Sequence, residues 1–226
     1  MASTGSGAPK PTEVKTSDLK SRFLQVAQTS VYQVRLQPPA AVAANLSQRG
    51  INYSSDGQDV ELSCTQTSLP GHKLQTFDIV NDYIGVTEKM PYRKQYDTEI
   101  SFTFNVNYKY DVVQMFEGWI DFVAGQFGDP TRYIDQYANY RMSYPTDYRS
   151  DSVYITKFEK SVGNEIAEKE TTQTKENQRY KLDYTFVGAY PLAIVPTDVG
   201  YEKSRVLSYT VRMNYIRYVC ERKLIS

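Results

Sequence analysis

The sequence lacks most features of a secreted, disulfide-rich or membrane protein. Its 226 residues include only two cysteines, Cys64 and Cys220, which is too few for a disulfide framework. We expect both to be buried thiols in a protein made in a reducing cytosol. No apolar run approaches the roughly 20 residues of a membrane-spanning helix, so we expect no membrane insertion. The N-terminal segment also lacks the apolar centre of a signal peptide.

An excess of charge of one sign is also missing. Lysine plus arginine equals aspartate plus glutamate, 26 against 26, so no net field attracts a polyanion and nucleic-acid binding is disfavoured. The stretch from Arg132 to Arg149 interleaves arginine and tyrosine as single-strand binders do, but its aspartates cancel the charge. A protein interface or a core helix is favoured there. Tyrosine is abundant, with 20 residues, and its apolar ring with a polar tip suits strands and partly wet interfaces.

Recognisable catalytic and metal-binding spacings are absent as well. The sequence has no Gly-rich phosphate loop, no GxSxG or HExxH motif and no calcium-binding loop. The single histidine, His72, follows a Pro-Gly turn, and we expect it to be an exposed loop residue. Neighbouring carboxylates flank a helix end or lie in a charged stretch, and we interpret them as structural or solvated: Asp121, Asp129, Glu165, Glu168 and Glu170. The sequence therefore gives an enzyme little support.

The strongest pattern is a strand that leads into an amphipathic helix, between residues 87 and 125. Apolar residues at 100, 102, 104 and 106 alternate with Ser101, Thr103, Asn105 and Asn107. Asp111, with Gln114 three residues later, predicts the start of the helix, and Gly125 predicts its end. One stripe of the helix is expected to be core: Val112, Phe116, Trp119, Ile120 and Val123.

A second long alternating strand is predicted at residues 205–218. Its apolar face contains residues 207, 209, 211, 213 and 215, and its polar face contains Ser208, Thr210, Arg212 and Asn214. Shorter strands are predicted at 22–36, 60–67, 74–80, 83–93, 153–158 and 182–186, with a turn-rich bridge at 188–196. Four tyrosines at helical spacing suggest a short helix that Pro145 stops. They are a candidate subunit interface: Tyr133, Tyr137, Tyr140 and Tyr144.

The domain organisation follows from these elements. Residues 1–20 are small and polar and predict a flexible arm, whereas residues 21–226 predict one domain. Long loops are expected at 37–59, with room for a short helix at 40–46, and at 159–181. The predicted fold class is mainly β, a β-sandwich or half-barrel of antiparallel strands with one packed α-helix.

The order of several segments resembles the tail-tube proteins of contractile-tailed bacteriophages. The segments are SLPG at Ser68, VTEKMPYRKQYD, TEISFTFNVN, the FxxW helix VVQMFEGWIDFV, and the GAYP turn at Gly188 followed by a long alternating strand. The resemblance spans about residues 60–218. It implies a tail-tube fold, six copies to a ring, rings stacked into a hollow virion tube that conducts DNA, and no catalysis or cofactor. The implied neighbours are the tail sheath, the baseplate hub and tape-measure proteins, with assembly in the host cytoplasm.

In such a tube the polar faces of the two long strands are expected to line the lumen, where DNA passes without specific binding. This set is Ser101, Thr103, Asn105, Asn107, Ser208, Thr210, Arg212 and Asn214. Two alternatives remain. One is a baseplate-proximal tube initiator with the same fold, and the other is a monomeric β-sandwich module whose tyrosines bind a ligand.

Overall fold

The structure, a computed structural model, describes residues 29–51, 60–81, 85–126, 141–158, 180–201 and 206–224. The strands are β1 (Tyr32–Leu36), β2 (Cys64–Thr67), β3 (His72–Asn81), β4 (Val86–Tyr96), β5 (Glu99–Asn105), β6 (Val153–Phe158), β7 (Tyr180–Val187), β8 (Tyr190–Val195), β9 (Ser208–Asn214) and β10 (Arg217–Leu224). The labelled helices are α2 (Ala40–Gln48), α4 (Asp111–Val123) and α6 (Pro145–Tyr148). The paired strands are antiparallel, so the predicted mainly β fold is confirmed.

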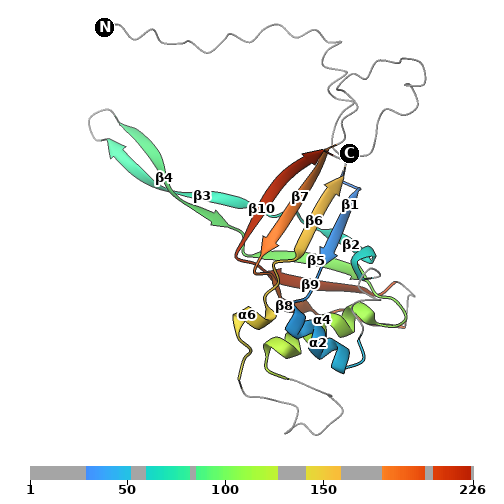
Figure 1. Ribbon diagram of the computed structural model, residues 1–226. Coiled ribbons are helices and arrows are strands. Elements are labelled where there is room, and N and C mark those ends of the chain that lie inside the picture. Colours follow the sequence, from blue (N-terminus) through green and yellow to red (C-terminus); the bar gives the residue numbers. More distant parts are fainter. Residues whose placement is uncertain are drawn as a thin grey trace, which may run out of the picture.

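Two four-stranded sheets make the body of the molecule. Sheet A has the strand order β1-β6-β7-β10, and sheet B has the order β2-β5-β9-β8. Their strands cross one another, and α2, α4 and α6 gather at one end of the body (Figure 1). A two-stranded sheet, the β3–β4 hairpin, projects away from it (Figure 1). The architecture is therefore a two-sheet β body with packed helices and a protruding hairpin.

One hydrophobic core joins the two sheets and the helices. In β1, β5 and β9 every second residue faces this core, as the alternation of a strand requires. Phe104 of β5 and Phe116 of α4 meet with ring centroids 5.4 Å apart, which places α4 against the apolar face of sheet B. Each fully buried large side chain contributes roughly 1.5 to 3 kcal/mol. The largest come from both sheets, from α2 and from α4: Val34, Leu36, Leu46, Phe102, Phe104, Met115, Phe116, Trp119, Ile155, Phe186, Met213 and Tyr215.

The prediction of one long strand at residues 205–218 was wrong, because the chain changes sheet inside it. β9 belongs to sheet B and β10 to sheet A. Between them the Tyr215 N–H donates to the carbonyl of Thr98, whereas the Ile216 N–H donates to the carbonyl of Val187 in sheet A. Tyr215 is buried, and the next buried residue is Tyr218, three positions later. This break in the period of two marks the crossing, which ties the sheets together covalently.

Three shorter segments also differ from their predictions. Residues 60–62 are helical rather than extended, and the Ser63 hydroxyl and N–H both donate to the Val60 carbonyl, at 2.7 and 3.2 Å. The predicted bridge at 188–196 contains β8, which follows Gly188 at a positive φ of 67°. The predicted loop at 37–59 contains α2, so the short helix expected there forms and is longer than expected.

The start of α4 is set by Asn107 rather than by Asp111 and Gln114. Tyr110, at a φ of 60°, occupies the N-cap position and its side chain makes no capping bond. The Asn107 carbonyl oxygen Oδ1 accepts from the Asp111 N–H at 3.2 Å, and Asn107 Nδ2 donates to the Asp111 carboxylate at 2.6 Å. At the other end Gly125, at a φ of 79°, ends the helix as predicted.

The tyrosine stripe proposed as a subunit interface is described only at its end. Tyr133, Tyr137 and Tyr140 lie outside the described residues, as do Asp129, Glu165, Glu168, Glu170 and the predicted N-terminal arm. Tyr144 is extended and exposed, and Pro145 begins α6 instead of stopping a helix, since proline is compatible with a first helical turn. None of the helices in the described ranges is long and apolar enough to cross a membrane.

Candidate assembly surfaces

Sheet B has one face turned to the core and one turned to solvent. The polar residues of its central strands β5 and β9 lie opposite one another: Glu99 with Asn214, Ser101 with Arg212, Thr103 with Thr210 and Asn105 with Ser208. The hydroxyl oxygens of Thr103 and Thr210 are 3.0 Å apart. The structure therefore brings the predicted channel-lining residues together on one face, apart from Asn107, which lies beyond β5 and holds the start of α4.

This solvent face is neutral except for one ion pair. Within β2, β5, β8 and β9 the only charged residues are Glu99 and Arg212. Arg212 Nη1 lies 3.6 Å from Glu99 Oε2, and the two side chains are 50% and 45% exposed. On β2, the hydroxyls of Thr65 and Thr67 donate to backbone carbonyls of β5. The face offers hydroxyl and amide groups that water can wet, with little net charge.

Sheet A has the opposite character. Its strands contain six cations against two carboxylates, Asp183 and Glu221: the cations are Arg35, Lys157, Lys181, Arg217, Arg222 and Lys223. The strand register places Lys157 and Arg222 on the same side of the sheet as the buried Phe186, so the outward face carries four of these cations against the two carboxylates. This face is basic, whereas the solvent face of sheet B is neutral.

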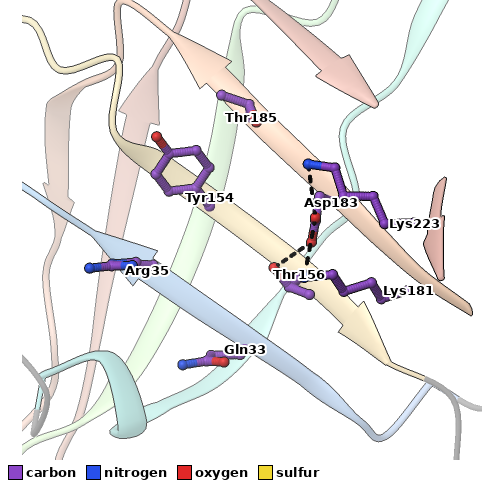
Figure 2. Close-up of a pocket in the computed structure, with 8 residues that line it drawn as sticks. All are labelled: Gln33, Arg35, Tyr154, Thr156, Lys181, Asp183, Thr185 and Lys223. Atoms are coloured by element: carbon purple, nitrogen blue, oxygen red, sulfur yellow. Dashed lines mark hydrogen bonds and ion pairs between the residues drawn. The ribbon is translucent and has the colours of Figure 1, made fainter. Parts of the chain in front are cut away.

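A shallow depression of about 280 Å³ lies on the outer face of sheet A, around Asp183 (Figure 2). Its carboxylate accepts from the Thr156 hydroxyl at 2.9 Å and lies 3.5 and 3.4 Å from the ammonium groups of Lys181 and Lys223. Burial raises the pKa of Asp183, but these partners together lower it below its ordinary 3.8. The depression is thus lined by an ion network that also includes Glu221, 2.9 Å from Lys223. The network fixes β6, β7 and β10 together, and the Asp183 carboxylate is already engaged by its own partners.

The β3–β4 hairpin exposes large apolar side chains. On one face Phe77 lies opposite Met90, and its ring is 6.2 Å from that of Tyr92. Phe77, Met90 and Tyr92 are 50%, 40% and 63% exposed. Isolated two-stranded hairpins are marginally stable in water, and exposed apolar patches mark interaction sites. This pattern is typical of an interaction surface.

The base of the hairpin is anchored by aromatic residues. His72 Nδ1 lies 2.5 Å from the hydroxyl oxygen of Tyr218, whose ring meets Tyr96 edge-on at 5.4 Å. His72 is exposed, as expected, but it begins a strand instead of lying in a loop. The histidine joins the hairpin to β10.

The predicted core stripe of α4 is only partly the buried one. Val112, Phe116 and Trp119 are buried, whereas Ile120 and Val123 are half-buried. Sequence reasoning missed Met115 and Phe122, which are buried because α4 contacts α2 and α6 as well as sheet B. The helix is covered over a wider arc than one stripe.

Two further expectations concern cysteine and aspartate. The thiols are free, but Cys64 is only partly buried and Cys220 is exposed, so the prediction of two buried thiols was wrong. Cys220 lies in β10, an edge strand of sheet A, where side chains at the rim stay accessible. Asp121 is structural, as interpreted, because its carboxylate lies 2.7 Å from the Arg49 guanidinium that follows α2.

A family model described as phage tail tube protein matches residues 27–221 of this sequence. The chain belongs to the phage tail tube protein family. The match includes both sheets, the hairpin and α4, and membership means that the chain has a structural role in a tail tube rather than an enzymatic one. No curated protein matches the sequence.

Several solved structures of low sequence identity are similar to this family member. The tube-terminating cap of the anti-feeding prophage is 12% identical, with 88% of this chain and 92% of that chain covered and a TM-score of 0.44. A chain of the PVC sheath-tube complex in the extended state is 12% identical, with 92% and 99% covered and a TM-score of 0.44. An Hcp protein is 13% identical, with 84% and 91% covered and a TM-score of 0.38.

Proposed function

We propose that six copies of this chain close into a ring, that the rings stack into the tube of a contractile phage tail, and that DNA leaves through the lumen. The observation that carries the proposal is the neutral solvent face of sheet B. A channel for DNA needs a wall that water wets, without dense cations that would hold phosphates in a salt-dependent manner. In this proposal Ser101, Thr103, Ser208 and Thr210 belong to the wall.

The edges of sheet B support closure into a ring. Its outer strands, β2 and β8, run in opposite directions, since the sheet has four antiparallel strands. The β8 edge of one copy can therefore extend onto the β2 edge of the next as another antiparallel pair. Such head-to-tail contacts close into a ring when the rotation between copies permits. Unpaired edges would otherwise favour aggregation.

The hairpin supplies a second contact between copies. The hairpin projects beyond the body of the subunit (Figure 1). In this proposal its exposed Phe77, Met90 and Tyr92 contact a neighbouring subunit. Burying these side chains on assembly removes apolar surface from water, which favours the tube over the isolated chain.

The remaining parts of the proposal concern the neighbours of the tube and the place where it assembles. With sheet B on the lumen, the basic face of sheet A is turned outward, toward the sheath, and the end rings meet the baseplate hub. The lumen also holds the tape-measure protein before DNA passes. The chain acts in the virion tail and assembles in the host cytoplasm.

Electron microscopy and light scattering on the purified chain test the proposal. We expect rings or hollow tubes, and a double substitution in the hairpin, F77S/M90S, should abolish them while far-ultraviolet circular dichroism stays unchanged. Tyr108→Ser is the matched control, because Tyr108 is 86% exposed and outside the hairpin. A 25.9 kDa monomer at all concentrations would contradict assembly and favour the monomeric binding module. Copy number in the virion, one or two rings against many, separates a tube initiator from the main tube subunit.

A further inference from the structure

The solvent face of sheet B carries one cation, and one carboxylate lies beside it. Glu99 is two residues before Ser101, the residue opposite Arg212, so Glu99 and Arg212 form a diagonal pair on the same face. Their charged groups are 3.6 Å apart, and both side chains remain about half exposed. Arg212 is therefore neutralised yet still accessible from the solvent side.

We propose that Glu99 is the counter-charge that prevents Arg212 from holding DNA phosphates as DNA moves through the tube. This inference rests on the proposed function, because it requires the solvent face of sheet B to line the lumen. Arginine binds phosphate through paired N–H donors, so a free guanidinium on this wall would be a phosphate site. With the Glu99 carboxylate at its side, the same guanidinium carries no net charge into the channel.

Repetition makes a single pair important. In a six-fold ring the six copies of Arg212 lie at the same level along the tube axis. Loss of Glu99 leaves each of them without its counter-charge and so adds six positive charges to each ring. A binder that neutralises about six phosphates loses about a thousandfold in affinity between about 50 and about 200 mM salt. A lumen without Glu99 should therefore retain DNA at low salt and release it at high salt.

The charge distribution within the subunit supports a specific role for this pair. The strands of sheet A contain six cations against two carboxylates, whereas the strands of sheet B contain one cation with one anion next to it. General solubility does not account for this contrast, since it would act on both sheets alike.

The test uses tubes assembled from the full chain in the presence of a short fluorescent DNA duplex, followed by nuclease treatment. We expect E99Q tubes to retain nuclease-protected duplex at low salt, wild-type tubes to retain little, and E99Q/R212Q tubes to return to the wild-type level. Glu221→Gln is the matched control, because it removes one carboxylate from sheet A instead. If E99Q subunits do not assemble alone, tubes mixed with wild-type subunits should retain duplex in proportion to their mutant fraction.

The outcomes separate this inference from the proposed function. E99Q tubes that retain no more duplex than wild-type and E221Q tubes would overturn the role of Glu99 while the tube itself stands. If E99Q tubes bind the duplex but nuclease still digests it, the solvent face of sheet B lies outside the tube. That result would overturn both the role of Glu99 and the proposed function. Retention that persists in E99Q/R212Q tubes would show that Arg212 is not the phosphate site, and would also refute the inference.

Discussion

Trp119 is the side chain whose replacement should destabilise the subunit most. Its ring is 0% exposed, and its Nε1 donates to the Tyr148 carbonyl at 3.0 Å, which fixes α6 to α4. Trp119→Ala removes a buried aromatic ring and should cost about 3 to 5 kcal/mol. Trp119→Phe keeps an apolar ring but leaves the Tyr148 carbonyl without its donor, and should cost about 1 to 3 kcal/mol. Against a total stability of about 5 to 15 kcal/mol, the alanine variant approaches unfolding.

Urea unfolding followed by circular dichroism measures these costs. The measurement should use concentrations at which the chain is monomeric, because assembly adds apparent stability. Tyr108→Ala is the control: Tyr108 is 86% exposed, and its replacement should change the free energy of unfolding by less than about 0.5 kcal/mol. If the Trp119→Ala midpoint matched that of Tyr108→Ala, α4 would not be part of the core, and the account of the fold would fail.

Three further predictions test the packing, the thiols and the ion network. Gly118→Ala should lower the melting temperature although alanine favours helix, because the added Cβ would lie 2.5 Å from Leu46 Cδ2. Gly200→Ala is the control and should have little effect, because the space around Gly200 is open. Equal melting temperatures for the two variants would refute the close approach of α2 to α4. Alkylation at pH 8 should modify Cys220 well before Cys64, since burial raises the pKa of Cys64 to about 11, and mass spectrometry showing equal rates would contradict this. Asp183→Asn should lower the melting temperature at pH 7, because the ionised Asp183 carboxylate stabilises the folded state when its pKa is depressed by folding. The difference in melting temperature between wild type and variant should vanish as pH falls below 3.8 and the carboxylate takes up a proton in both folded and unfolded chains. A difference that is constant with pH would contradict the network.

The elements that the sequence predicts well are those with a long, regular period. The alternation at 100–105 and the apolar stripe of α4 each extend over several residues, so one residue that departs from the pattern does not obscure it. The crossing between β9 and β10 was missed because it shifts the alternation by only one position, at Ile216 and Arg217. The helical turn at residues 60–62 was missed because its apolar residues also fit a strand.

The candidate surfaces were predictable only where the alternation within each strand already separates polar from apolar residues. The polar residues of β5 and β9 share a face because each strand alternates and the two are neighbours. The pairing of Glu99 with Arg212 depends on the register between strands that are distant in sequence, which a single sequence does not contain. The exposure of Phe77 and Met90 depends on the hairpin leaving the body, and apolar strand residues by themselves suggest burial.

The most direct test of the central claim is an electron cryo-microscopy reconstruction of tubes formed by this chain. We predict six-fold rings with Ser101, Thr103 and Thr210 on the lumen wall and sheet A on the outside. A reconstruction with sheet A lining the lumen would reverse the assignment of faces, and a preparation without rings or tubes would contradict the proposed assembly.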